Sequence, residues 1–313
     1  MSIIYIADCA ENGGVYVYNL EGNKLSQQQF IQLSKPMYLC KEKSRLFCIL
    51  RAPFDDNTSG ILSFDIDNNG LLCNHSDILS TEGVVSCHLC VENGMVFNAN
   101  YLSGSVNKLG IKTVTHNGKG THPTRQESPH THFTRVSPDG KYILVCDLGL
   151  DTIFTYDKDL NEISKVKVPD GNGVRHLEYS EDKKTIYSAD ELSNTISVFD
   201  YDDGVLKYLT SVNGLPENFV GENTAAAIKR HGKLLYISHR GYDGISVFDI
   251  SNKTPKFVTS FKAFGNSPRD FEIVDDYIIV ANEGGNVTVI DKQNYNLKYE
   301  IKLSSPLCVI KGD

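Results

Sequence analysis

Six side chains that can hold an anion or transfer a proton recur at comparable places along the chain. They are His132, Arg175, Glu191, Arg240, Arg269 and Glu283. A histidine or a glutamate can take a proton from water, and an arginine can stabilise a developing negative charge. Any one of them could equally be structural, for example in an ion pair between Arg175 and Glu191. The combination is better explained by a small anionic molecule bound between them, provided that the fold brings these distant residues together.

The residues from Arg125 to His132, with the sequence RQESPHTH, lead into a predicted β-hairpin. Its turn is SPDGK at residues 137–141, in which proline fixes φ, aspartate bonds its own backbone and glycine accepts a positive φ. Because His132 and Asp147 are equally far from this turn, the hairpin places them at the same end of a sheet. Arg125 could instead stabilise the loop, and His88, His130 and His176 could bond neighbouring loops rather than a ligand.

The hairpin belongs to a unit that recurs seven times. The second strands of the units are predicted to end at residues 6–8, 49–51, 98–100, 145–147, 188–190, 237–239 and 280–282, which are 43 to 49 residues apart. The third strands alternate in strand periodicity and often end in aspartate, and no segment has the pattern of a long amphipathic helix. Repeats of about 40 to 50 residues with four short strands are typical of a β-propeller. We therefore predict an all-β fold, a seven-bladed β-propeller with four-stranded antiparallel blades.

The two ends of the sequence predict how the ring closes. The chain begins with a second strand at residues 3–7, and the strand at residues 306–310 matches a first strand with nothing after it. We expect this C-terminal strand to join the N-terminal blade, because an unpaired sheet edge would then be avoided. A single domain over residues 1–313 is expected.

The repeat alignment predicts which side chains line one mouth of the axial channel. The innermost strands begin at Met37, Cys87, His132, Arg175, Ala225, Arg269 and Leu307. The residues that follow the second strands are Cys9, Ala52, Tyr101, Leu148, Glu191, Arg240 and Glu283. The third to sixth units therefore supply the charged residues, whereas the others supply mainly apolar ones.

Composition excludes some classes of partner. The formal net charge is −8 and the basic residues are scattered, which argues against nucleic acid or an anionic membrane. No apolar run reaches the roughly 20 residues that span a bilayer, and no signal sequence is recognisable, so a cytoplasmic location is expected. The eight cysteines lie mostly in strand-like runs. Cys87 and Cys90 have a CxxC spacing without a second pair, so we predict reduced, buried thiols rather than a zinc site.

Four motifs together resemble one known family. They are residues 125–132, residues 137–142, residues 173–177 followed by 190–195, and residues 238–241. The chain resembles, over essentially its whole length, the lactonase family of seven-bladed β-propellers, which includes bacterial 6-phosphogluconolactonases and is related to the carboxy-cis,cis-muconate cyclases. His239 stands where the family usually has asparagine before the Arg-Gly pair, and Ala227 replaces a frequent glutamate.

The resemblance implies a central cleft that handles a lactone ring. It carries the catalytic roles to His132, Arg175, Glu191 and Arg240. Substrate binding is then expected from Arg125, His130, Arg269, Glu283 and Tyr101. No cofactor is expected, and no metal, because the inward-facing set is too cationic to favour a hard cation.

The expected activity is hydrolysis of 6-phospho-D-glucono-1,5-lactone to 6-phosphogluconate, a step of the pentose phosphate pathway. Glu191 or His132 would activate water, while Arg175 and Arg240 would stabilise the oxyanion. The expected partner is a small anionic lactone, and the protein is expected to be a monomer or a weak homodimer. Two alternatives stay open: a propeller that binds a ligand or a protein without catalysis, and a lactonase or cyclase for another organic acid such as a muconolactone.

Overall fold

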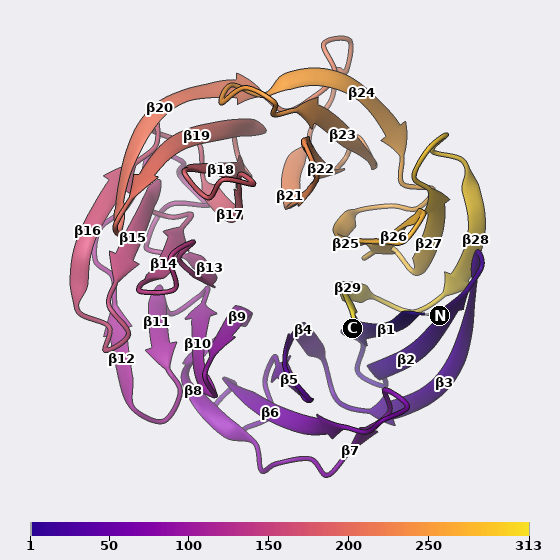
Figure 1. The fold of residues 1–313 in the computed structure, drawn as a ribbon. Coiled ribbons are helices and arrows are strands. Elements are labelled where there is room, and N and C mark those ends of the chain that lie inside the picture. The colour runs from indigo at the N-terminus through magenta and orange to yellow at the C-terminus, as the bar shows by residue number, and fades with distance from the viewer. Residues whose placement is uncertain (1, 313) are drawn as a thin grey trace.

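The computed structural model describes residues 2–312, and within them the chain forms seven antiparallel sheets arranged as the blades of a ring (Figure 1). The inner strand of each blade faces the axis and the outer strand lies at the rim. The predicted seven-bladed β-propeller is therefore confirmed. The part of the chain described here has no helix that is long and apolar enough to cross a membrane.

The first three blades follow one another along the chain. The first blade contains β4 (Pro36–Glu42), β5 (Arg45–Leu50), β6 (Thr58–Ile66), β7 (Leu72–Cys73) and β8 (Leu79–Val84). The second contains β9 (Ser86–Glu92), β10 (Met95–Asn100), β11 (Ser105–Lys108) and β12 (Lys112–Thr115). The third contains β13 (Thr131–Val136), β14 (Ile143–Asp147), β15 (Thr152–Tyr156) and β16 (Glu162–Lys167). The first blade departs from the predicted pattern, because β7 and β8 both pair with β6 and so divide its outer strand.

The next three blades are regular. The fourth contains β17 (Val174–Tyr179), β18 (Thr185–Asp190), β19 (Thr195–Asp202) and β20 (Val205–Asn213). The fifth contains β21 (Thr224–His231), β22 (Leu234–Arg240), β23 (Gly244–Asp249) and β24 (Lys256–Lys262). The sixth contains β25 (Pro268–Val274), β26 (Tyr277–Asn282), β27 (Asn286–Asp291) and β28 (Leu297–Lys302).

The seventh blade joins the two ends of the chain. It contains β29 (Pro306–Lys311), β1 (Ser2–Asp8), β2 (Gly14–Glu21) and β3 (Lys24–Gln32), in that order from the axis. Tyr5 pairs with Ile310 and Ala7 with Cys308. The predicted closure by the C-terminal strand is confirmed, and the two ends lie close together in Figure 1.

Apolar side chains pack between neighbouring blades and hold the ring together. One such cluster joins the third and fourth blades through Phe133, Leu144, Cys146, Ile153, Leu177, Ile186 and Phe199. Each large apolar side chain buried in this way contributes about 1.5 to 3 kcal/mol. The alternation read from the sequence thus gives every blade two apolar faces, one for each neighbour.

A β-bulge lies near the start of every inner strand. In the third blade Thr131 pairs with Asp147 and Phe133 with Cys146, which leaves His132 without a partner in the ladder. The predicted placement of His132 and Asp147 at one end of a sheet is confirmed. The same register shift leaves Met37, Cys87, Arg175, Arg269 and Leu307 unpaired in their own blades.

Two of the predicted channel positions were wrong by one residue. In the fifth blade Ala225 pairs with His239, as Val174 pairs with Asp190 in the fourth, and the ladder resumes at Ile228, so the residues without a partner are Ala226 and Ala227 rather than Ala225. In the first blade Leu50 pairs with Pro36, so the residue after the second strand is Arg51 rather than Ala52. The apolar run of β5 continues one residue further than those of its repeat partners, because Leu50 stands where β14 and β18 have Asp147 and Asp190, and the aligned pattern therefore placed the strand end one residue too late.

All eight cysteines are free thiols, as predicted. Cys87 lies at the bulge of β9 with its Sγ 3.4 Å from the His132 carbonyl oxygen, whereas Cys90 packs between the second and third blades. The prediction that the thiols are buried was wrong for Cys73, which is exposed at the end of the short strand β7, and Cys9 and Cys40 are only half-buried.

Candidate active site

The mouth of the channel is formed by the bulged residues and by the residues that follow the second strands. Glu191 comes directly after β18, and its N–H donates to the carbonyl of Gly173 at 2.8 Å. Gly173 has φ 68°, and a Cβ there would lie 2.5 Å from Leu192 Cγ, so glycine is needed for this approach. Asp190 fixes the end of β18 by accepting hydrogen bonds from nearby hydroxyl groups and an amide.

The carboxylate of Glu191 is the centre of a charged cluster. Its Oε1 lies 2.5 Å from Arg125 Nη2, and its Oε2 lies 2.9 Å from Arg175 Nε and 3.0 Å from Arg240 Nη2. His132 Nε2 lies 4.0 Å from the same Oε2. The four residues with predicted catalytic roles, together with Arg125, therefore meet at one point, although they come from three blades and a loop.

The cluster determines the charge state of its members. Burial alone would raise the pKa of Glu191, but the guanidinium groups of Arg240 and Arg175 hold that pKa well below its ordinary value. Burial and the neighbouring Arg175 lower the pKa of His132 well below its usual range, so its imidazole is neutral at pH 7. The site thus combines an ionised carboxylate, three guanidinium groups and a neutral imidazole.

Tyr101 and His130 form the wall next to His132. Arg125 Nη2 donates to the hydroxyl of Tyr101 at 3.3 Å, and the ring of Tyr101 meets that of His132 edge to face at 5.5 Å. His130 stacks behind Tyr101, and its ring nitrogens lie 3.1 Å from the Tyr101 carbonyl and 3.2 Å from Glu127 Oε1. Tyr101 therefore faces the cluster, whereas His130 lies behind Tyr101 with both ring nitrogens next to groups of the protein.

Arg269 and Glu283 lie at the same mouth but do not contact Glu191. Arg269 Nη1 is paired with Glu283 Oε2 at 3.0 Å. Arg269 also lines a narrow constriction of about 10 Å³ in the channel, together with His132 and Arg175. Beside the cluster, Arg125 and Arg240 line an open cavity of about 480 Å³ that also includes His122, Asn223 and Thr224.

Sequence reasoning missed Arg51 and the wall of this lateral cavity. Arg51 occupies in the first blade the position that Glu191 occupies in the fourth, since its N–H donates to Lys35 O as that of Glu191 donates to Gly173 O. A comparison of the backbone pairing partners, rather than of apolar runs, would have found it. His122, Asn223 and Thr224 lie on or next to loops between blades, where the repeat gives no signal. No group of three histidine, cysteine, aspartate or glutamate side chains within residues 2–312 is arranged to hold a metal ion.

Because several histidines are buried in the neutral form, we expect the stability of the fold to decrease in acid. Burial lowers the pKa of His239 to about 4, and it lowers the pKa values of His88, His132 and His176 well below the usual range. The unfolded state therefore binds more protons than the folded state as soon as the pH falls below about 6.5. We expect the free energy of unfolding, measured with urea, to decrease between pH 6.5 and 4. His239→Asn should lower this slope by about 1.4 kcal/mol per pH unit, and an unchanged slope would contradict the prediction.

Comparison with known proteins identifies the family. The family model described as "Lactonase, 7-bladed beta-propeller" matches residues 3–310. The chain belongs to the lactonase family of seven-bladed β-propellers. The match spans all seven blades and includes every residue of the charged cluster.

Several other proteins are similar to this chain over nearly its whole length. An uncharacterized protein of Staphylococcus aureus strain USA300 is 32% identical, with 92% of each chain covered. A Lactobacillus plantarum protein of known structure has a TM-score of 0.88 and 26% identity, with 99% of each chain covered. The structure of a candidate 6-phosphogluconolactonase of Bacteroides fragilis has a TM-score of 0.87 and 25% identity, covering 100% of this chain and 98% of that one.

Proposed function

We propose that this protein is a lactone hydrolase that acts without metal or cofactor, and that its substrate is 6-phospho-D-glucono-1,5-lactone. The observation that carries the proposal is the contact of three arginines with Glu191, at 2.5 to 3.0 Å, beside the neutral imidazole of His132. One carboxylate does not neutralise three guanidinium groups. The excess positive charge suits a substrate whose carbonyl oxygen becomes negative during the reaction.

His132 is the better candidate for the general base. The lowered pKa of Glu191 makes its carboxylate a weak proton acceptor, and two of its arginine partners already occupy Oε2. A water molecule can bridge the 4.0 Å between His132 Nε2 and Glu191 Oε2. When His132 accepts a proton from this water, the imidazolium is stabilised by the nearby carboxylate. Glu191 then orients the arginines and the water rather than removing the proton itself.

The hydrolysis can be written from these positions. The water oxygen attacks the lactone carbonyl carbon as its proton passes to His132, and the resulting oxyanion is stabilised by Arg175 and Arg240. The bond between the carbonyl carbon and the ring oxygen breaks, and the proton on His132 passes to that oxygen to form a hydroxyl group. The product is a hydroxy acid, which releases a proton to solvent. No covalent bond to the protein is needed.

Resemblance to the candidate 6-phosphogluconolactonase of Bacteroides fragilis supports the choice of a phosphorylated sugar lactone. Arg51 and Arg269 add positive charge to the mouth without contacting Glu191. We assign the phosphate group to this side, where Arg269 can exchange its partner Glu283 for a phosphate oxygen.

The decisive experiment measures hydrolysis of 6-phospho-D-glucono-1,5-lactone by the purified protein against the spontaneous rate. No acceleration would overturn the proposal in favour of a binding propeller. Faster hydrolysis of a muconolactone would reassign the substrate.

Replacing Arg269 tests the phosphate position. We expect Arg269→Gln to raise the KM for the phosphorylated lactone about tenfold, because one charge-assisted hydrogen bond is lost. The KM for unphosphorylated D-glucono-1,5-lactone should stay unchanged. An equal rise for both lactones would remove Arg269 from phosphate binding.

A further inference from the structure

The channel has a second cavity at the end opposite the charged cluster. It measures about 480 Å³ and is lined by residues from all seven inner strands, further along these strands than the bulges. The constriction that includes His132 and Arg175, with about 10 Å³ of space, separates it from the first mouth. The volume is within the range of about 300 to 1,000 Å³ that is usual for small-molecule sites.

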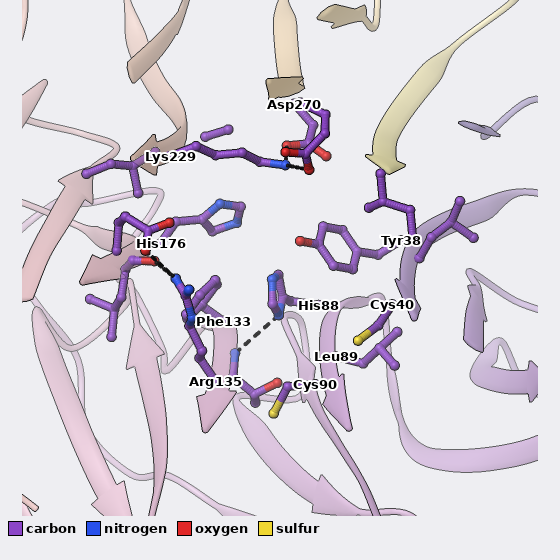
Figure 2. Close-up of a pocket in the computed structure, with 18 of the residues that line it drawn as sticks. Tyr38, Cys40, His88, Leu89, Cys90, Phe133, Arg135, His176, Lys229 and Asp270 are labelled. Atoms are coloured by element: carbon purple, nitrogen blue, oxygen red, sulfur yellow. Dashed lines mark hydrogen bonds and ion pairs between the residues drawn. The ribbon is translucent and has the colours of Figure 1, made fainter. Parts of the chain in front are cut away.

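Side chains from different blades converge in this cavity. Figure 2 shows the Tyr38 hydroxyl and the rings of His88 and His176 directed toward its centre, with Lys229 and Asp270 at one side. The His88 ring packs against Tyr38 and Phe133, with centroid separations of 4.2 and 4.1 Å. These contacts give the polar atoms a fixed position, so the site is formed before any ligand arrives.

The acidic groups of the cavity already have partners. Glu178 is paired with Arg135 at 3.1 Å, and Glu272 is paired with Lys229 at 2.8 Å. Asp270 lies 3.5 Å from Lys229 and accepts a hydrogen bond from the N–H of Val309 at 3.1 Å. The carboxylates are therefore paired with groups of the protein, and the hydrogen-bonding groups available to a ligand must lie elsewhere in the cavity.

Two donors remain unfilled. His88 Nδ1 accepts the N–H of Thr134 at 3.4 Å, so in the neutral ring the hydrogen is on Nε2. Neither His88 Nε2 nor the Tyr38 hydroxyl has a hydrogen-bond partner within residues 2–312, although His88 is only 5% exposed. Burial raises the pKa of Tyr38 well above its usual range, so its hydroxyl keeps its proton. Both groups can therefore donate a hydrogen bond to a bound ligand.

The charge of the cavity indicates an anionic acceptor. Its lining contains the basic residues Lys41, Arg135, Lys229, Arg230 and Lys311 and the acidic residues Glu178, Asp270 and Glu272. Basic groups thus exceed acidic ones by five to three. The ion pairs along the side offer both donors and acceptors, which is what the hydroxyl groups of a ligand need.

We propose that this cavity is a second ligand site, which binds a small hydroxy carboxylate through Tyr38 and His88. The carboxylate accepts hydrogen bonds from the Tyr38 hydroxyl and from His88 Nε2. The hydroxyl groups of the ligand lie against the pairs of Lys229 with Asp270 and of Arg135 with Glu178. The site does not depend on the proposed lactone hydrolysis, because the constriction separates the two ends of the channel.

The test uses D-gluconate as the probe and the full chain with isotope-labelled histidine rings. We expect saturable shifts of the His88 ring resonances, which are assigned with His88→Phe. Tyr38→Phe keeps the ring and removes only the unpartnered oxygen, so it should fold normally and bind D-gluconate about tenfold more weakly at His88. Arg240→Gln, at the other mouth, should leave this affinity unchanged. Sorbitol, a polyol without a carboxylate, should cause no saturable shift.

Several results would overturn the proposal. They are the absence of a saturable shift at His88, equal affinity in Tyr38→Phe, equal binding of sorbitol, or loss of binding in Arg240→Gln. Because the measurement does not use catalysis, a protein that fails to hydrolyse lactones can still pass it, and an active hydrolase can still fail it.

Discussion

His132→Ala should reduce kcat/KM for the lactone by a factor of about 10² to 10⁴, the usual contribution of a positioned general base. His132 is the titratable group that lies next to Glu191 without forming a close ion pair with it, at 4.0 Å. Its lowered pKa means that the base is already unprotonated at neutral pH. The rate should therefore be constant from neutral pH down to the acidic side of pH 6.5, and the acidic limb should disappear in the variant.

The matched control for this experiment is His130→Ala. His130 lies two residues away, but its nitrogens face the Tyr101 carbonyl and Glu127 rather than the cluster. We expect a much smaller loss of kcat/KM and an unchanged acidic limb. A His132→Ala variant with the wild-type rate would remove His132 from the mechanism.

Glu191→Gln should destabilise the fold by about 3 to 5 kcal/mol, because Arg125, Arg175 and Arg240 would lose the buried carboxylate that all three contact. Arg175 and Glu191 are 3% and 2% exposed, so water cannot replace the missing charge. Urea unfolding at pH 7 measures the effect. The stabilisation by Glu191 is present above its ordinary pKa and is lost as the pH falls toward its lowered folded-state pKa, so the two proteins should become more alike in acid.

Glu283→Gln is the control for the loss of stability, because it removes a carboxylate from a more exposed ion pair. Its partner Arg269 sits at the same mouth, but this pair is 22% and 37% exposed, and we expect a loss of stability below about 1 kcal/mol.

Glu191→Gln should also reduce kcat by at least about 10²-fold, since Arg175 and Arg240 would lose the carboxylate that orients them. If Glu191→Gln were as stable to urea as the wild type, the buried arginines would not need the Glu191 carboxylate to stay in place.

Most of the architecture could be predicted because a propeller repeats its pattern seven times. The blades, the closure between residues 2–8 and 306–311 and the common end of His132 and Asp147 were predicted correctly. Errors arose where the repeat is irregular. Arg51 was aligned one position too early because Leu50 replaces the polar residue that ends most of the other second strands, and the split between β7 and β8 follows from a loop that interrupts the outer strand.

The composition of the candidate site could be predicted, but not its geometry. Repeat positions correctly placed Arg175, Glu191 and Arg240 at one mouth, since each occupies a defined place in its blade. They could not show that Arg125, from a loop outside the repeat, contacts Glu191 at 2.5 Å. Nor could they show that Tyr101 faces the cluster while His130 lies behind it, because this difference depends on how the two rings stack.

The bulges allow seven similar blades to carry different residues at the mouth of the channel, so the scaffold is symmetric although its electric field is not. A bulged residue has no partner in the ladder, so its identity is largely free of the sheet's pairing rules. The seventh, first and second blades use this freedom for Leu307, Met37 and Cys87, which are 5 to 9% exposed. These residues form an arc without charged groups that adjoins His132, with Cys87 Sγ 3.4 Å from the His132 carbonyl oxygen. Because little water can enter from that side, the field of the arginines is directed across the mouth instead of being screened.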